Sequence, residues 1–308
     1  MKWIYYLLRK SSPQKYKPVL LVTGCSSGIG LALAKLLWKT QYRVVITARE
    51  SSLTKIKLKP REDKWIRPLD VNLSEDRKKL VNEIQKKWGG VDILVNNAGI
   101  SYRAVVEHMN EVEELSQLRT NYLSPMAMIR LVLPGFRERG RGKIINVSSV
   151  SGMLAMPTMS SYSASKHALE GASEALWYEM KPLGINVSLI QPGFIRSDSF
   201  KNVYYSKQSA EAEGAKEPYS EYYDNMSPFI ESFMSRSPIT AEKVAKTILK
   251  VIRTENPPLR VPVGLEAYVF YYLRRLMPRR LFHPLLFSLL PGARHWGEGY
   301  SKARRLKK

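Results

Sequence analysis

The sequence has very little cysteine and no long apolar run, and each shortage excludes a class of protein. Cys25 is the only cysteine among 308 residues, so no disulfide can form within the chain, as is typical of a reducing compartment. Residues 1–10 hold six apolar residues between charges, too few for a signal-peptide core or a membrane-spanning helix. The apolar stretches 265–273 and 281–291 are also too short to span a bilayer. We therefore expect a cytoplasmic protein.

Acidic residues are fewer than basic ones, 27 against 49, and the excess lies at the two ends of the chain. Residues 1–18 carry a net +5 and residues 259–308 a net +9, together 14 of the 22 net charges. No aromatic and basic reader motif accompanies this charge, so we expect no nucleic-acid partner. Arginines beside short apolar stretches in 265–292 suit a segment at the cytoplasmic face of a membrane. The same segment could instead cap a substrate pocket or form a dimer contact.

Hydrophobic residues are plentiful, at 44%, and they are arranged as alternating strands and helices. Apolar, β-branched runs predict strands at 19–24, 43–48, 64–71, 91–99, 142–149 and 184–193. Helical patterns lie between them at 31–38, 76–88, 121–137 and 162–181. This alternation predicts an α/β fold with a parallel sheet covered on both faces. No linker or repeat interrupts it before about residue 195, so one domain is expected.

The first predicted strand runs into the glycine-rich sequence TGCSSGIG, residues 23–30. Glycines at a strand-to-helix turn let the backbone approach a pyrophosphate, which then rests on the helix N-terminus. The strand before and the helix after are the context that such a motif requires. We predict a dinucleotide site with contacts from Gly24, Ser26, Ser27, Gly28, Ile29 and Gly30.

The sequence YSASK places Tyr162 and Lys166 one turn apart on one face of a predicted helix, with small residues between them. A free phenol titrates near pH 10, too high for a base at neutral pH. A positive charge one turn away favours the phenolate. The pair therefore suits general acid–base catalysis.

Taken together, TGCSSGIG, NNAG (96–99), Asn121, Ser149 and YSASK resemble the short-chain dehydrogenase/reductase family in order and spacing, over roughly residues 18–260. The resemblance implies a single doubly wound Rossmann domain with about seven parallel strands, and NAD(H) or NADP(H) as cofactor. It implies that Tyr162 is the general acid/base and that Lys166 also holds the nicotinamide ribose. Ser149 would hydrogen-bond the substrate oxygen. Asn121, at the start of a long helix, would hold a water for proton relay.

The resemblance also implies cofactor contacts outside the glycine-rich turn, and no metal site is predicted. Asp70 and Val71 would lie at the adenine, and Asn97, Ala98 and Gly99 would pack along the cofactor. The sequence QPGFIRS (191–197) would cover the nicotinamide carboxamide. Its contacts would be Pro192, Gly193, Ile195 and Ser197, although the family often has Thr at the last position.

The end of the second predicted strand indicates which cofactor is used. An NAD enzyme usually has an acid there for the ribose 2′-hydroxyl. This sequence has Ala48 and then Arg49, and a guanidinium suits a 2′-phosphate. Glu50 is expected to point away. NADP(H) is therefore favoured over NAD(H).

Residues 196–238 carry the evidence about the substrate. They lack a strand pattern, and they place aromatic and Met residues at helical spacing, namely Tyr219, Tyr222, Tyr223, Met226, Phe229, Ile230, Phe233 and Met234. The resemblance makes this segment a lid over a bulky apolar substrate; packing of one helix face on the core is the alternative. Residues 255–264 look like those of hydroxysteroid and retinol dehydrogenase relatives. Steroid, retinoid and long-chain carbonyl substrates all remain open.

Three segments are therefore expected: an apolar and basic N-terminus (1–17), a catalytic domain (18–264) with its lid, and a helical apolar and basic extension (265–308). The leading function is NADP(H)-dependent interconversion of a lipophilic alcohol and its ketone or aldehyde. The alternatives are an NAD(H)-dependent oxidative alcohol dehydrogenase and a catalytically idle scaffold of the same fold at a membrane. A homo-oligomer is expected.

Overall fold

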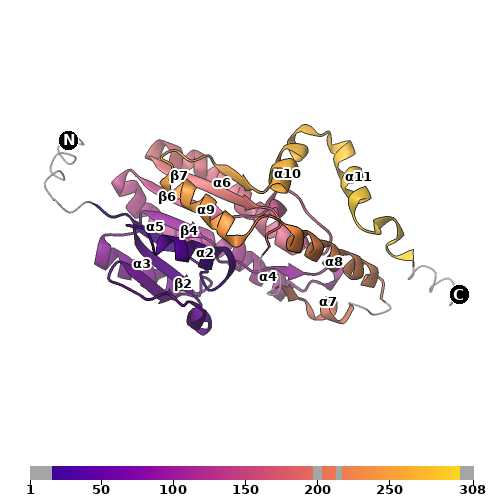
Figure 1. The fold of residues 1–308 in the computed structure, drawn as a ribbon, viewed down its shortest axis with the longest axis horizontal. Helices are drawn as coiled ribbons and strands as arrows, with labels where there is room; N and C mark the ends of the chain where they lie inside the picture. Colours follow the sequence, from indigo (N-terminus) through magenta and orange to yellow (C-terminus); the bar gives the residue numbers. More distant parts are fainter. Residues whose placement is uncertain (1–15, 197–202, 213–216, 299–308) are drawn as a thin grey trace.

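A sheet of seven strands forms the centre of the structure, a computed structural model that describes residues 16–196, 203–212 and 217–298 (Figure 1). Its order is β3-β2-β1-β4-β6-β7-β9, and every neighbouring pair is parallel. The strands are β1 (Val19–Val22), β2 (Arg43–Ala48), β3 (Lys64–Pro68), β4 (Ile93–Asn96), β6 (Gly142–Val147), β7 (Ile185–Pro192) and β9 (Arg260–Val263). The chain leaves β1 toward one edge and returns on the other side through β4. This reversal opens a crevice at the carboxyl ends of the strands.

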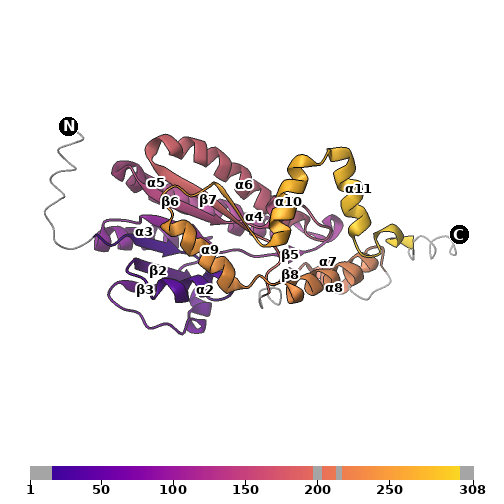
Figure 2. The same ribbon diagram turned by 45° about the horizontal axis from the view of Figure 1, so that its top comes forward.

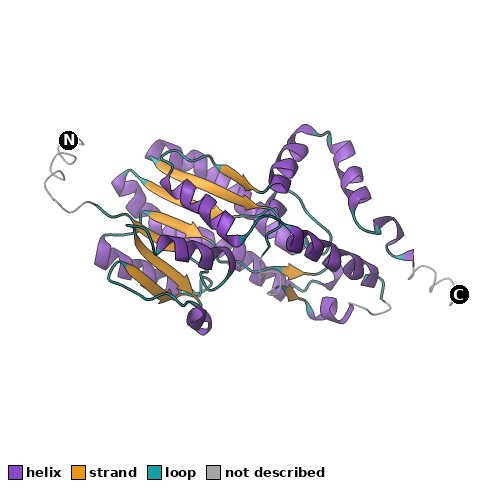
Figure 3. Cartoon of the chain, viewed as in Figure 1, coloured by secondary structure: helices purple, strands orange, loops and turns teal. Residues whose placement is uncertain are grey.

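Helices cover both faces of the sheet (Figures 2 and 3). They are α2 (Gly28–Leu37), α3 (Ser74–Trp88), α4 (Glu111–Leu118), α5 (Ser124–Arg139), α6 (Ser160–Met180) and α9 (Ala241–Arg253). Alternate residues of β1 serve the two layers: Leu20 and Val22 pack with α2 and α9, whereas Val19 and Leu21 pack with α3 and α5. Both layers are apolar, so the strands read as continuous apolar runs. The predicted doubly wound α/β fold is confirmed.

Smaller elements stand beyond the carboxyl ends of the strands. β5 (Tyr102–Arg103) pairs in parallel with β8 (Tyr204–Tyr205), and α7 (Lys207–Ala212) and α8 (Ser220–Arg236) follow. The turn η2 (Val106–His108) holds α8 through Tyr223, whose hydroxyl accepts a hydrogen bond from the Val105 N–H at 3.0 Å and lies 3.1 Å from His108 Nδ1. The other short turns are η1 (Glu50–Lys55), η4 (Val150–Gly152), η5 (Lys181–Leu183) and η7 (Ala293–His295).

The predicted C-terminal helical extension is present. It forms a hairpin of α10 (Leu265–Leu276) and α11 (Arg279–Leu289) that projects from the body above α8 (Figures 1 and 2). Ala267 anchors α10, because it is 0% exposed and packs on Val150 and Met153. Large apolar side chains on the other faces are exposed: Leu265, Tyr268, Val269, Tyr272, Leu276, Leu281, Leu285, Phe287 and Leu289. None of the described helices combines the length and the apolar character needed to cross a membrane.

The start of the helix that contains Asn121 was predicted wrongly. The helix begins at Glu111, where the Asn110 side chain accepts a hydrogen bond from the Glu113 N–H at 2.9 Å. It runs through a π-helical turn, η3 (Arg119–Leu123), into α5, so Asn121 lies inside it. The first turns escaped prediction because EVEELSQL is mostly polar and has only one fully buried side chain, Gln117.

Candidate active site

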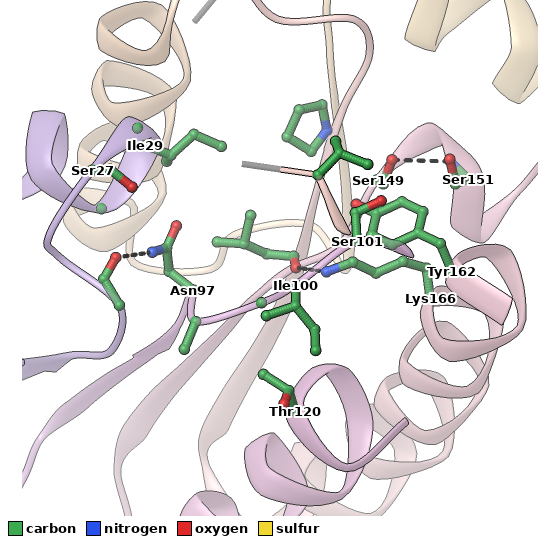
Figure 4. A pocket seen from close by; sticks show the side chains of 18 of the residues that line it. Ser27, Ile29, Asn97, Ile100, Ser101, Thr120, Ser149, Ser151, Tyr162 and Lys166 are labelled. Atoms are coloured by element: carbon green, nitrogen blue, oxygen red, sulfur yellow. Dashed lines mark hydrogen bonds between the residues drawn. The ribbon is translucent and has the colours of Figure 1, made fainter. Parts of the chain in front are cut away.

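A cavity of about 670 Å³ lies at the carboxyl ends of the strands and reaches from the glycine-rich turn to α8 and α10 (Figure 4). Three of the predicted catalytic residues line it: Ser149, Tyr162 and Lys166. So do all the predicted cofactor residues that the structure describes: Gly24, Ser26, Ser27, Gly28, Ile29, Gly30, Arg49, Asp70, Val71, Asn97, Ala98, Gly99, Pro192, Gly193 and Ile195. Ser197 lies outside the described residues. Asn121, the fourth predicted catalytic residue, does not line the cavity.

The glycine-rich turn is shaped by close backbone packing. Gly24 has φ +72°, and a Cβ there would lie 2.6 Å from the Ala98 Cα. A Cβ on Gly30 would lie 2.1 Å from the Gly24 carbonyl oxygen. Ser27 precedes α2 without capping it by its side chain, so N–H groups of the first turn are free to meet an anion. The turn therefore fits a dinucleotide pyrophosphate.

Thr23, which the sequence reasoning missed, ties this turn to the loop after β4. Its Oγ1 accepts hydrogen bonds from the N–H groups of Asn97 at 3.0 Å and Ala98 at 3.1 Å. In return, Asn97 Nδ2 donates to the Gly24 carbonyl at 2.8 Å. Asn97 therefore uses its amide to hold the cavity wall together. Thr23 could have been identified from the sequence, since it is the first residue of the glycine-rich motif TGCSSGIG.

The far end of the cavity, at β2 and β3, carries two cations. Arg49 follows β2 and Lys55 ends η1, and both line the cavity while Glu50 does not. Ser52 of η1 lines it as well. Sequence reasoning missed Ser52 and Lys55, because only the fold of η1 brings them back to the end of β2. Asp70 is the one acidic side chain among the described residues that line the cavity, and its Oδ1 accepts a hydrogen bond from the Asn72 N–H at 2.9 Å.

Ser149 and Tyr162 meet at the near end of the cavity (Figure 4). Ser149 follows β6, and its Oγ accepts a hydrogen bond from the Ser151 N–H at 3.1 Å. Tyr162 stands in the first turn of α6. Burial raises the pKa of Tyr162, and a hydrogen bond with Ser149 opposes this by lowering it. The phenol is therefore held neutral at physiological pH and can donate a proton.

Lys166 lies below Tyr162 and is 6% exposed. Its Nζ donates to the Val147 carbonyl at 3.0 Å and lies 5.7 Å from the centre of the Tyr162 ring. Burial lowers the pKa of Lys166 to about 8, with Glu170 acting in the opposite direction. The sequence predicted that this ammonium lowers the pKa of Tyr162. Burial instead raises the pKa of Tyr162, Lys166 is not among the causes of that shift, and the ammonium is held by a backbone carbonyl.

Asn121 joins the π-helical turn to the loop after β4. It is 1% exposed, and its Oδ1 and Nδ2 bond the N–H and the carbonyl of Ile100, each at 2.9 Å. Nδ2 also donates to Ser165 Oγ at 3.0 Å. A Cβ on Gly99 would lie 3.2 Å from Asn121 Oδ1, so the glycine leaves room for this contact. The side chain thus positions the loop beside α6, the helix that carries Tyr162 and Lys166.

The end of the cavity near α8 and α10 is lined by apolar side chains of separate segments. Phe194 follows β7, Ile230 and Met234 come from α8, and Phe270 comes from α10. Met156 and Met159 add side chains from the turn before α6. A cavity with a polar pair at one point and apolar walls around it can hold a carbonyl on an apolar body.

Comparison with known proteins agrees with this geometry. The family model described as short chain dehydrogenase matches residues 18–208. The chain is 34% identical to the 3-ketodihydrosphingosine reductase of Bacteroides thetaiotaomicron, over 82% of this chain and 90% of that protein. It therefore belongs to the short-chain dehydrogenase/reductase family and is an NAD(P)-dependent oxidoreductase.

Solved structures of the family have the same fold. A short-chain dehydrogenase from Streptomyces avermitilis has a TM-score of 0.73 at 31% identity, with 84% of this chain and 92% of that chain covered. A variant of the actinorhodin polyketide ketoreductase, solved with NADPH, has a TM-score of 0.64 at 28% identity, with 80% and 96% covered.

Proposed function

We propose that this protein reduces a lipophilic ketone or aldehyde to its alcohol with NADPH, and that Tyr162 is the general acid. The observation that carries the proposal is that Ser149, Tyr162 and Lys166 line one cavity whose other walls include the apolar side chains of Phe194, Ile230, Met234 and Phe270. The names of two relatives, a 3-ketodihydrosphingosine reductase and a polyketide ketoreductase, support a ketone substrate. A long-chain ketone is favoured on this ground over a steroid or a retinoid.

The roles of the side chains follow from their positions. Ser149 holds the carbonyl oxygen, and the Tyr162 hydroxyl transfers its proton to that oxygen as the alcohol forms. A raised pKa suits this direction, because the phenol stays protonated until it is needed. Lys166 stands below Tyr162 to stabilise the phenolate until a proton returns from solvent. NADPH, when bound, supplies the hydride that the carbonyl carbon accepts.

We further propose that the segment 196–238 acts as the lid and that 18–264 is the catalytic unit. Helix α8 supports this role, because it contributes Ile230 and Met234 to the cavity. Near its N-terminus the helix contacts η2 through the hydroxyls of Tyr219 and Tyr223, and just after its C-terminus Ser237 Oγ donates to the Phe194 carbonyl at 2.6 Å. A helix that lines the cavity on one face in this way can enclose a bound substrate.

The α10–α11 hairpin supports a peripheral contact with an anionic membrane on the cytoplasmic face. Leu276 is 79% exposed and Leu281 is 61% exposed, next to the exposed arginines Arg275 and Arg280. Apolar burial and attraction to lipid headgroups act together in such a surface. Phe270 of the same hairpin lines the cavity, so membrane contact and pocket capping are compatible.

A substrate screen tests the proposal. Purified protein is assayed with NADPH against long-chain ketones, steroid ketones and retinal, beside the Tyr162→Phe variant. We expect turnover of at least one class and a loss of about 10²–10⁴-fold in the variant, with NADPH affinity kept. A variant that retained more than about a tenth of the rate would remove Tyr162 from the chemistry. NADPH binding without turnover of any class would favour the idle scaffold.

A further inference from the structure

Arg103 is a buried arginine in the wall of the cavity. It stands in β5 and is 3% exposed. Its Nε is buried without a hydrogen-bond partner. Within residues 16–196, 203–212 and 217–298, no hydrogen bond or ion pair to its guanidinium is found. Two partly buried arginines, by contrast, lie beside acids: Arg139 beside Asp92, and Arg260 beside Glu170.

Such a charge is unfavourable unless something compensates it. A guanidinium stays protonated at every physiological pH, and burying an unpaired charge is strongly destabilising. The acid lining the described cavity, Asp70, follows β3 at the adenosine end. Arg103 is not at that end, so no carboxylate of the described residues pairs with it.

The neighbours of Arg103 place it at the substrate end. The Ala104 N–H donates to the Thr158 carbonyl at 2.8 Å, just before α6 and Tyr162. β5 is paired with β8, whose Tyr204 also lines the cavity. The long helix α6 begins beside this point, and its N-terminus also favours negative charge. Two sources of positive potential therefore meet next to the catalytic tyrosine.

We propose that Arg103 binds an anionic group of the substrate, a carboxylate or a phosphate, while the apolar walls from α8 and α10 hold its chain. The substrate class is then a long-chain keto acid or keto phosphate, reduced to the corresponding hydroxy compound. A neutral lipid leaves Arg103 unpaired, and a long-chain amine is repelled by it. This inference rests on the proposed function, since the reacting group is still the carbonyl at Tyr162.

The test compares substrates that differ only in the head group. The probes are a mid-chain oxo-octadecanoic acid, its methyl ester, the amine of equal length, and a keto phosphate monoester of equal length. For the wild type we expect kcat/KM for the acid or the phosphate to exceed that for the ester by about 10–100-fold, the usual range for charge-assisted hydrogen bonds. The better of the two anions identifies the head group.

Arg103→Gln and Arg103→Lys assign the preference to this side chain. In Arg103→Gln the KM for the anion should rise until anion and ester are used equally, with kcat for the ester kept. Arg103→Lys should restore part of the preference. Calorimetry in the presence of NADP⁺ should show that Arg103→Gln also binds the oxo acid more weakly than the wild type does. The midpoint of thermal unfolding of Arg103→Gln should stay level or rise, because an unpaired buried charge is removed.

Several outcomes would overturn the inference while leaving the proposed function intact. One is reduction of the ester or the amine at least as well as the anions. Another is an equal loss for all probes in Arg103→Gln, which would make the residue structural. A third is weaker NADPH binding in that variant, which would assign Arg103 to the cofactor. If no probe is turned over and the oxo acid does not bind, the proposed function fails as well.

Discussion

Arg49 and Lys55 are the two residues by which the protein would distinguish NADPH from NADH. Both line the cavity beyond β2, while Glu50 between them in the sequence does not. A guanidinium and an ammonium around one phosphate provide both directed hydrogen bonds and an additional point charge. The proposed NADP(H) preference would thus depend on two positive side chains and on the absence of an acid at Ala48.

Arg49→Asp should weaken NADPH binding by about 10–100-fold, because it replaces a charge-assisted hydrogen bond with a repulsive charge. NADH binding should change only a few-fold. Fluorescence titration of both cofactors measures the two dissociation constants. Lys55→Ala is the matched control and should show a smaller loss in the same direction. Equal losses for the two cofactors would show that Arg49 does not contact the 2′-phosphate.

Lys166 makes stability depend on pH in a direction that can be tested. Its pKa in the folded chain, about 8, lies below the ordinary value of 10.5. Between these values the unfolded chain binds the proton more tightly, so the contribution of this group to stability rises with pH and is complete above about 10.5.

Lys166→Met removes the buried charge and should abolish turnover. Near pH 7 the variant should unfold at a higher temperature than the wild type, by about 2–4 °C for each kcal/mol of removed penalty. The difference should shrink as the pH rises from about 8 toward 10.5. Scanning calorimetry across that range checks this. A difference that did not change with pH would mean that Lys166 is not neutralised in this window.

At the scale of elements, the sequence predicted strands most accurately where both faces of the strand are buried. β1, β2 and β7 are buried almost throughout, so their runs of Val, Ile and Leu are unmistakable. β9 was not identified because Arg260 and Pro262 interrupt its apolar pattern. Helix α9 was not predicted either, although Val244, Ile248 and Ile252 mark a buried face. The lack of an acidic partner for Arg103 could not be predicted from the local sequence, because it depends on which segments pack around β5.

The α10–α11 hairpin gives an element-scale prediction. Replacing Leu276, Leu281 and Leu289 together by Ser should lower binding to anionic vesicles by about tenfold or more, since each removes apolar area from the interface. The three side chains are 61–79% exposed, so folding should be unaffected. Vesicle flotation measures the bound fraction. High salt should release the wild type only partly, because screening weakens only the charge contribution.

The matched control replaces Val106, Val112 and Leu115, which are 53–78% exposed on η2 and α4. These changes remove similar exposed apolar area from another surface and should leave flotation unchanged. Equal effects of the two triple variants, or no flotation of the wild type, would exclude a membrane role. The hairpin would then cap the pocket or contact a second copy of the chain. In the second case it would be the candidate interface of the expected homo-oligomer.

At the scale of the whole molecule, most of the net positive charge belongs to segments outside the central sheet. The sheet and its two apolar layers carry the cofactor cradle, while the basic excess is concentrated in the terminal segments. The hairpin stands at the same end as α8 and β5 (Figure 2). Ile230 of α8 and Phe270 of α10 line the cavity, so the hairpin borders the catalytic cavity.

Because Phe270 walls the cavity while its neighbour Val269 is 49% exposed, a long-chain substrate bound to a bilayer would pass from lipid to Tyr162 along α10 without crossing water. The relevant substrate concentration is then its mole fraction in the membrane. Adding inert lipid at constant total substrate should slow turnover by dilution within the surface. Velocity would follow the lipid composition more closely than the bulk concentration.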